Sequence, residues 1–244
     1  SESQSAARKG GYTAQDIEVL EGLEPVRRRP GMYIGGTDER AMHHLVAEVL
    51  DNAMDEAVAG HATRIELTVS KNDTVTIKDN GRGIPTDPHP KMKGKSALEV
   101  ILTTLHSGGK FSGKAYETSG GLHGVGISVV NALSETLVVD VARDKQAWRQ
   151  TYSRGAPTSK LQSLGNANWR GTLVTFTPDH EIFGKTTHFK PERLYALARS
   201  KAYLFKGVEI RWTCDPALLR GDDVPATATL HFPGGLADYL NESL

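Results

Sequence analysis

The stretch of residues 38–60, DERAMHHLVAEVLDNAMDEAVAG, limits most strongly what this chain can fold into. Its apolar residues recur three and four positions apart, which is the spacing of one face of an α-helix. Asp38 can cap the start of a helix, and Gly60 can adopt the left-handed conformation just past its end. The sequence therefore predicts a single helix here, with one face packed on a core. That face comprises Leu45, Val46, Val49, Leu50, Ala53, Met54 and Ala57.

The opposite face of this predicted helix is acidic. Like charges four residues apart repel by about 0.2–0.5 kcal/mol per pair, so such a face is either solvated or turned towards a cation. On the helix alone, a solvated face is the simpler interpretation. The alternative assigns a general base to Glu48, with His44 one turn earlier, and a Mg²⁺ ligand to Asn52 one turn later. The polar residues concerned are Glu48, Asp51, Asn52, Asp55 and Glu56.

Composition describes an ordinary globular protein. The chain has 244 residues, of which 38% are hydrophobic and 24% charged, and no apolar run is long enough to span a membrane. Cys214 is the single cysteine, which excludes a disulfide framework and a zinc cluster and fits a reduced, cytoplasmic setting. Lys and Arg together number 29, as do Asp and Glu, and this balance argues against a domain that binds nucleic acid over its whole surface. We expect a soluble protein with no membrane partner.

The chain divides into an arm and one domain. Residues 1–15 lack hydrophobic periodicity and are predicted to form a flexible N-terminal arm, on which Tyr12 is the first aromatic residue. Residues 16–244 are predicted to form the folded domain. Alternating apolar and polar residues predict strands at 64–70 and 74–79, joined as a β-hairpin. The second strand leads directly from Asp79 into a tight loop of residues 80–85 that contains Gly81 and Gly83.

Residues 107–126 contain too many glycines for a packed element and are predicted to form a mobile lid. A helix at 127–133 follows, and glycine-rich backbone that leads into a helix N-terminus is an anion site. The pattern alone leaves a flexible linker and a phosphate cradle equally open. It is not the Gly-x-x-x-x-Gly-Lys-Ser/Thr phosphate loop, because Phe111 follows Lys110. Further helices are predicted at 95–106, 191–204 and 236–240, and further strands at 171–177 and 208–212 and, as a second hairpin, at 137–142 and 147–152.

Taken in order, the polar and glycine motifs resemble those of one protein superfamily. They are similar to the motifs of the Bergerat-fold (GHKL) ATPases, which include type II topoisomerase ATPase subunits, Hsp90 chaperones, MutL proteins and sensor histidine kinases. The resemblance implies an α+β fold of two layers, in which helices cover one face of a mixed, mostly antiparallel sheet. The motifs are Glu48-x-x-Asp51-Asn52-x-x-Asp55-Glu56, Asp79-x-Gly81-x-Gly83, Gly120-Gly121-Leu122-His123-Gly124-Val125-Gly126 and Gly171-Thr172.

Longer segments resemble one branch of that superfamily. Residues 26–35, 105–111 and 119–132 look like the ATPase subunits of bacterial type II DNA topoisomerases, and the likeness extends from about Tyr12 to the end. Details at 110–112, 127–130 and 201–210 favour the B subunit of topoisomerase IV over the B subunit of gyrase. The resemblance implies an ATP-binding and ATP-hydrolysing domain that drives DNA strand passage. A chaperone-type or histidine-kinase-type nucleotide module is the more distant alternative.

The resemblance also implies roles for individual residues, with ATP and Mg²⁺ as ligands. Glu48 is implied as the general base that activates water, with His44 orienting it, and Asn52 as the Mg²⁺ ligand. Asp79 is implied to accept a hydrogen bond from the adenine amino group, and Thr172 to support the same edge of the base.

The walls of the implied pocket come from the tight loop and from two arginines. Gly83, Ile84 and Pro85 are implied to enclose the adenine. Arg82 and Arg149 are implied to line the pocket mouth, which is the region that inhibitors of this family exploit and which makes it an antibiotic target.

Further contacts are implied on the arm and the lid. Tyr12 would reach the ATP of a second copy of the chain, and Tyr116 would close over the nucleotide. Phosphate contacts are implied for Lys110, Gly121, Leu122, His123, Gly124, Val125, Gly126 and Ile127.

The implied partners are a second copy of the chain in an ATP-dependent dimer, the DNA-cleaving A subunit of the topoisomerase, and DNA through the full complex. Family members also use a lysine from a following transducer domain, and no such segment follows residue 244. We therefore expect this fragment to bind ATP, to hydrolyse it weakly and to remain monomeric unless the arm pairs.

Overall fold

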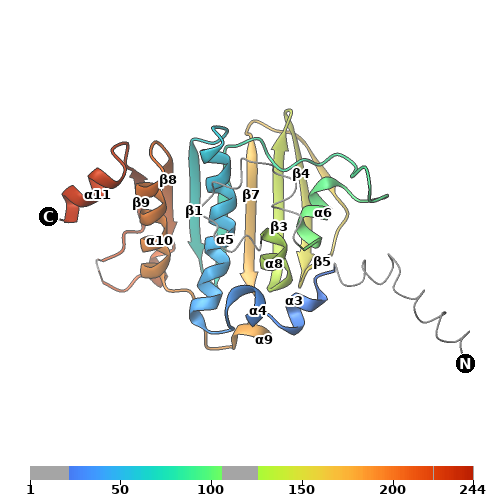
Figure 1. Cartoon of the computed structure of the whole chain (residues 1–244), viewed down its shortest axis with the longest axis horizontal. Helices are drawn as coiled ribbons and strands as arrows, with labels where there is room; N and C mark the ends of the chain where they lie inside the picture. The colour runs from blue at the N-terminus through green and yellow to red at the C-terminus, as the bar shows by residue number, and fades with distance from the viewer. Residues whose placement is uncertain (1–21, 106–125, 222, 244) are drawn as a thin grey trace, which may run out of the picture.

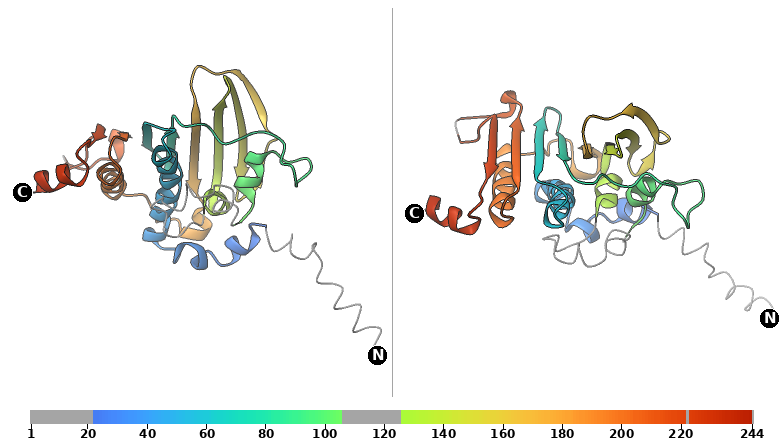
Figure 2. Two further views of the ribbon diagram at one scale, coloured as in Figure 1. Left: turned by 45° about the horizontal axis from the view of Figure 1, so that its top comes forward. Right: turned by 90° about the horizontal axis from the view of Figure 1, so that it is seen from above.

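The chain folds as two layers, a nine-stranded sheet with its helices on one face (Figure 1, Figure 2). The structure is a computed structural model and describes residues 22–105, 126–221 and 223–243. The strand order is β5-β4-β3-β7-β2-β1-β8-β9, with β6 paired to β4, and every pair is antiparallel except β1 with β8. The implied mixed, mostly antiparallel sheet is confirmed.

The strands follow the alternating segments of the sequence. Both predicted hairpins form, the second closed by Asp144 and Lys145, which both have positive φ as a tight hairpin turn requires. The strands are β1 (Arg64–Ser70), β2 (Thr74–Asp79), β3 (Ser134–Arg143), β4 (Gln146–Ser153), β5 (Ala156–Pro157), β6 (Gln162–Asn166), β7 (Gly171–Pro178), β8 (Glu209–Cys214) and β9 (Thr227–His231).

The helices pack on the inner face of this sheet. The predicted helix at 95–106 is shorter, because Ser96 caps its start by accepting a hydrogen bond from the Glu99 N–H, and it ends at Thr103. The helices are α3 (Glu24–Arg28), α4 (Gly31–Ile34), α5 (Glu39–Val58), α6 (Ala97–Thr103), α8 (Ile127–Ala132), α9 (His180–Phe183), α10 (Pro191–Leu204), the 3₁₀ helix η2 (Pro216–Leu218) and α11 (Leu236–Ser243). No helix in the described ranges has the length and apolar character needed to cross a membrane.

Helix α5 is the central element of the helical layer and lies over β1, β2 and β7 (Figure 1). Asp38 caps it by accepting the Ala41 N–H at 2.9 Å, and Gly60 follows it with a φ of 85°. Its apolar face is buried as predicted from Leu45 to Met54, and Ala57, also predicted on that face, is partly buried against the core.

The interpretation of the other face of α5 as a solvated surface is wrong. Glu48 and Asp55 are buried, although each is charged in its ordinary state. Asp51 forms an ion pair of 2.7 Å with Lys201 of α10, and both side chains are largely buried. Because its acidic residues are packed and paired, this face is part of the fold rather than a surface turned to water.

The antiparallel pairing of β2 with β7 gives the sheet two ends that differ in chemistry. Lys78 pairs with Leu173, so Asp79 and Gly171 meet at the upper end of Figure 1. The turn after β1, which contains Asp73, and the residue after β7, Asp179, lie at the lower end together with α9. We call these the upper end and the lower end of the sheet.

Candidate functional site

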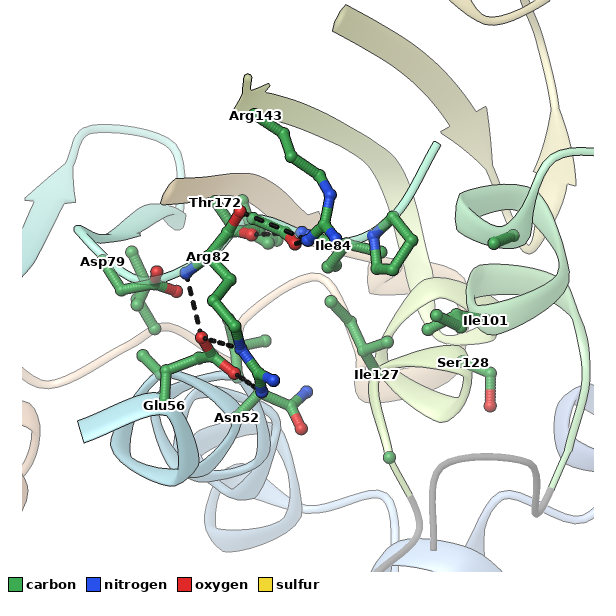
Figure 3. A pocket seen from close by; sticks show the side chains of 18 of the residues that line it. Asn52, Glu56, Asp79, Arg82, Ile84, Ile101, Ile127, Ser128, Arg143 and Thr172 are labelled. Atoms are coloured by element: carbon green, nitrogen blue, oxygen red, sulfur yellow. Dashed lines mark hydrogen bonds and ion pairs between the residues drawn. The ribbon is translucent and has the colours of Figure 1, made fainter. Parts of the chain in front are cut away.

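A cavity of about 590 Å³ opens at the upper end of the sheet, between α5, α6 and the start of α8 (Figure 3). Residues far apart in sequence meet around it. Of the residues for which the sequence implied a ligand contact, those that line it are Asn52, Asp79, Arg82, Gly83, Ile84, Pro85, Gly126, Ile127 and Thr172.

Asp79 supplies the one buried carboxylate of the cavity wall among the described residues that line it. It ends β2 and is 7% exposed, and its Oδ1 accepts the Gly81 N–H at 2.8 Å. Burial raises the pKa of Asp79 to about 6, the nearby charge of Glu56 adds to the rise, and hydrogen bonds from Gly81 and Thr172 oppose it. No described cation forms an ion pair with Asp79. The carboxylate is therefore ionised at neutral pH and able to accept a further hydrogen bond from the cavity.

Two glycines let the backbone come close to Asp79. Gly171 has a φ of 134°, and a Cβ on it would lie 1.9 Å from the carbonyl oxygen of Asp79. A Cβ on Gly81 would lie 2.6 Å from a carboxylate oxygen of Glu56. At Gly171 the clash is with backbone, so only glycine fits there without moving the chain, whereas at Gly81 the nearest atom ends the Glu56 side chain, which can shift. Gly171 therefore determines the shape of the cavity around Asp79.

Thr172 holds the tight loop against the sheet. Its Oγ1 accepts the N–H of Ile84 at 3.1 Å, which links the start of β7 to the loop after β2. Ile84 and Pro85 then present apolar surface to the cavity, as Figure 3 shows for Ile84. The part of the cavity beside Asp79 thus has a polar end and an apolar wall.

The Glu56–Arg82 pair lies in the wall of the cavity (Figure 3). Two guanidinium nitrogens of Arg82 donate to the Glu56 carboxylate at 2.7 and 3.2 Å, and the Arg82 backbone N–H donates at 3.0 Å. Burial alone would raise the pKa of Glu56, but the hydrogen bonds and charge of Arg82 outweigh it and the pKa is lowered. The pair is therefore a fixed, charged part of the wall, and Glu56 is a cavity residue to which the sequence assigned no ligand contact.

The second arginine of the cavity is Arg143, and the implied mouth residue Arg149 does not line it. Arg143 ends β3 and donates to the Gly83 carbonyl at 3.0 Å. Arg149 lies on β4 and makes a bidentate pair with Asp140 at 2.6 and 3.0 Å on the outer face of the sheet. The signal that would have found Arg143 is strand register, since its neighbour Ala142 pairs with Gly171, beside Asp79.

Glu48 and His44 lie one turn beyond the cavity along α5. Glu48 is 4% exposed, and its Oε1 lies 3.2 Å from Nε2 of His44. That hydrogen bond raises the pKa of His44, against the opposing effect of burial. Glu48 is not among the described residues that line the cavity, whereas Asn52, one turn along the same helix face, does line it. The geometry thus places a buried carboxylate, oriented by a histidine, next to the cavity rather than in its wall.

The described residues offer no ready-made cage for a metal ion. Within 22–105, 126–221 and 223–243, no three His, Cys, Asp or Glu side chains come together as a metal site. A single amide oxygen at Asn52 suits Mg²⁺, which takes few protein ligands and fills its shell with phosphate oxygens and water.

Several implied contacts fall outside the described residues and stay predictions. They are those of Tyr12, Lys110, Tyr116, Gly121, Leu122, His123, Gly124 and Val125.

Comparisons with known proteins agree on one family. A family model described as histidine kinase-, DNA gyrase B-, and HSP90-like ATPase matches residues 37–182. The chain is 63% identical to the B subunit of DNA topoisomerase 4 from Caulobacter vibrioides over 98% of its own length and 34% of the relative's. The B subunit of DNA gyrase from Thermotoga maritima is 49% identical over 94% of the chain and 35% of the relative. The chain therefore spans about a third of the length of these curated relatives.

A solved structure shares the fold. The 43K ATPase domain of Thermus thermophilus gyrase B, in complex with an aminocoumarin, superposes with a TM-score of 0.78 at 43% identity. The likeness covers 93% of this chain and 56% of that one.

Proposed function

Because the chain belongs to the histidine kinase-, DNA gyrase B- and HSP90-like ATPase family, we propose that its cavity binds ATP for hydrolysis within a type II DNA topoisomerase of the topoisomerase IV kind. The observation that carries the proposal is the buried, ionised carboxylate of Asp79 in the wall of the cavity. A carboxylate that accepts but cannot donate selects a ligand edge that carries N–H groups. The amino group of adenine is such an edge.

The shape of the cavity supports an adenine nucleotide. Its volume of about 590 Å³ lies in the range of small-molecule sites, and Ile84 and Pro85 offer one apolar wall against which a planar ring can stack. Thr172, held at the loop, lies on the same side as Asp79 and can support the same edge of the base. Gly126 and Ile127 line the cavity where α8 begins.

The catalytic part of the proposal rests on α5. Glu48 would take a proton from the attacking water, and His44 would hold its carboxylate in position through their 3.2 Å contact. Asn52 would hold Mg²⁺ together with phosphate oxygens, and the ion, when bound, would offset charge on the triphosphate. One helix turn separates the two roles, so a shift of α5 would affect both.

Residues outside the described ranges would complete the site. We assign phosphate contacts to Lys110 and to the backbone of residues 121–125, closure over the nucleotide to Tyr116, and contact with a partner copy's ATP to Tyr12. These assignments rest on the sequence motifs alone.

The proposed assembly is supported by the names of the relatives and by the sequence motifs rather than by the cavity. We propose that the chain acts in the cytoplasm, that it pairs with a second copy of itself when ATP binds, and that it works with a DNA-cleaving A subunit on DNA. The identity of 63% to the B subunit of a topoisomerase 4, against 49% to that of a gyrase, supports decatenation and relaxation over supercoiling. An assay of the full-length protein with each type of cleavage partner tests this choice, and ATP-dependent negative supercoiling would contradict it.

The sharpest test of the site separates binding from turnover. Glu48→Gln keeps the side-chain volume and removes the base, so nucleotide affinity measured by calorimetry should stay within about threefold while hydrolysis falls about 100-fold or more. Glu39→Gln is the matched control, because Glu39 is a carboxylate of the same helix that pairs with Lys190 and Arg193 at the lower end. Hydrolysis should be measured in a full-length protein that carries each substitution. Unchanged turnover in Glu48→Gln, or equal loss in the control, would contradict the assignment.

A further inference from the structure

A second, smaller cavity lies behind the nucleotide cavity, on the outer face of the sheet that the helices leave uncovered. Its volume is about 290 Å³, and strands β1 and β2 and the loop that precedes β7 form its walls. Asp79 belongs to the walls of both cavities, so the two lie back to back across the end of β2.

Positive charge dominates this outer cavity. Three cationic side chains line it, those of Arg64, Lys78 and Arg170. Glu66 supplies one carboxylate on the same outer face. The Lys78 ammonium lies 4.0 Å from Glu66, which is a loose contact between two partly exposed groups. No ion pair involves Arg64 or Arg170 among residues 22–105, 126–221 and 223–243, so no carboxylate in those ranges pairs with either guanidinium group.

The remaining polar groups of the outer cavity do not neutralise these cations. Asn80 is already committed, since its Oδ1 accepts the N–H groups of Thr63 and Arg64 at 2.8 and 3.0 Å and its amide donates to the Thr63 hydroxyl at 2.9 Å. Trp169 brings an aromatic ring to the same space, with the Lys78 ammonium 4.9 Å from the ring centroid. That cation–π contact fixes Lys78 without cancelling its charge.

We propose that Arg64, Lys78 and Arg170 form a phosphate-binding site on the outer face of the sheet. Guanidinium groups bind phosphate oxygens through paired N–H donors, and three cations in a cavity of this size match one phosphate group. The phosphate of a small ester and that of a nucleic-acid backbone share this chemistry. The site differs from the nucleotide cavity, because Arg64 and Lys78 alternate along their strands with the buried Ile65 and Ile77 and so lie on the opposite face of the sheet.

The position of the site also couples it to Asp79. The positive charge of Arg170 favours the ionised form of Asp79 and lowers its pKa. A phosphate bound by Arg170 offsets that charge, so it weakens a ligand that needs the Asp79 carboxylate ionised. Coupling of this kind is reciprocal, and a nucleotide in the main cavity weakens the phosphate to the same extent.

The test uses inorganic phosphate as the probe and the fluorescence of Trp169 as the signal, with the main cavity first saturated by a non-hydrolysable ATP analogue. We expect saturable binding that weakens about tenfold in Arg64→Gln/Arg170→Gln and is unchanged in Arg211→Gln. Arg211 is the matched control, an arginine of the same face that already pairs with Glu209 at 3.2 Å. Trp169→Phe should remove the fluorescence change while calorimetry still detects the binding.

A short DNA duplex in place of phosphate distinguishes the two sources. If the site takes nucleic-acid phosphate, the double variant should lower the salt dependence of duplex binding by about two counterions. If the site takes small phosphate esters, phosphate binds and the duplex does not. No saturable binding of either probe, or equal weakening in Arg211→Gln, would overturn the proposal. Failure of the ATP analogue to bind would count against the proposed function alone. Phosphate binding is measured separately, by comparing the Trp169 fluorescence of the wild type with that of Arg64→Gln/Arg170→Gln.

Discussion

Two buried aspartates at opposite ends of one strand pair show how differently this fold treats the same side chain. Asp79 ends β2 and Asp179 follows β7, and the antiparallel pairing of these strands sends one carboxylate to the upper end and the other to the lower end (Figure 1). Asp179 is 1% exposed and accepts hydrogen bonds from Arg27 and Arg154, each at 3.0 Å. Asp79 is 7% exposed and has no such cation among the described residues.

The pKa values of the two carboxyl groups are shifted in opposite directions from the ordinary value. Burial raises the pKa of both, but at Asp179 the N–H of Glu181 and the two arginines outweigh it, and the pKa is lowered. At Asp79 the two backbone N–H groups do not outweigh it, and the pKa rises to about 6. The lower end therefore uses its aspartate to hold elements together, since Arg27 also donates to the carbonyl of Ala132 at the end of α8.

The contrast indicates that the lower end of the sheet contributes to stability and the upper end to ligand binding. Asp73, at the lower end, is also fully engaged, with His180, His188 and the N–H of Phe189 within 3.0 Å of its oxygens. At the upper end, Asp79 lines the cavity and forms no ion pair with a cation among the described residues. An uncompensated buried charge that faces a cavity is typical of a functional group, whereas a compensated one is typical of a structural group.

Gly171→Ala should give the largest effect and tests whether the upper end depends on close backbone contact. The new Cβ would lie 1.9 Å from the Asp79 carbonyl oxygen, so the strand must move. We expect the free energy of unfolding to fall by about 4 kcal/mol, measured by urea denaturation. Gly60→Ala is the control, since Gly60 also has positive φ but nothing within 4 Å, and it should lose only about 1 kcal/mol. Equal losses would show that contact with Asp79 is not the cause.

Asp179→Asn should give the next largest effect. The change leaves Arg27 and Arg154 without their shared carboxylate, and we expect a loss of about 3 kcal/mol in the free energy of unfolding. Because Asp179 lies at the lower end, the affinity of the folded protein for an ATP analogue should change less than about twofold. A variant of full stability that loses nucleotide affinity would reverse the roles of the two ends.

Asp79→Asn should raise the free energy of unfolding, whereas Asp179→Asn lowers it, and the size of the increase should depend on pH. In the wild type the folded state holds the Asp79 proton up to about pH 6, whereas the unfolded state loses it near its ordinary pKa of about 4. The contribution of Asp79 to stability therefore decreases as pH rises through this window and stays low above it. Asn carries no charge, keeps an acceptor for the Gly81 N–H, and should raise the free energy of unfolding by about 2 kcal/mol at pH 8 and by little at pH 4.

The pH profile of Asp179 should have the opposite sign. Its lowered pKa stabilises the fold above the unfolded value of about 4, and that contribution is lost as pH falls through the folded pKa. Denaturation curves of wild type, Asp79→Asn and Asp179→Asn across pH 3 to 8 would separate the two contributions. Parallel profiles for the two variants would contradict the comparison.

Three arginine substitutions should give the smallest effects on stability. Arg143→Ala, at the cavity, should weaken the binding of an ATP analogue about tenfold with little change in the unfolding midpoint, because Arg143 lines the cavity. Arg154→Ala removes one of two cations on Asp179, so it should lower the unfolding midpoint slightly and leave the affinity for the ATP analogue unchanged. Arg149→Ala should not affect that affinity, and a loss there would return Arg149 to the mouth of the cavity.

The sequence predicted most of the sheet and the central helix, because those elements are patterned locally. Apolar alternation located β1, β2, β3, β4, β7 and β8, and capping residues located α5. It missed β6, whose five residues are all exposed, and the edge strand β9, whose burial is also weak, so neither carries an alternating core face. It extended α6 past Thr103, where no residue signals the end of the helix.

The residues of the candidate site also divide into those that the sequence motifs predicted and those that they did not. Asp79, Asn52 and Thr172 could be predicted from the motifs, and the structure brings all three around one cavity. The resemblance implied a place at the cavity for Arg149 and none for Arg143, because which arginine lines the cavity depends on the pairing of β3 with β7, which residue types alone do not fix. The compensation of Asp179 by Arg27 could not be predicted either, since 152 residues separate them.

The central claim is that the Asp79 carboxylate reads an amino group, and the most direct test compares ATP with inosine triphosphate, which has a carbonyl oxygen in place of that amino group. Calorimetry on the wild-type chain should show ATP binding at least about 30-fold more tightly than inosine triphosphate, because the latter turns an acceptor towards the buried carboxylate. Asp79→Asn should reduce this ratio to within a few-fold, since its amide can donate to the carbonyl. Equal affinity of the wild type for both nucleotides would contradict the account.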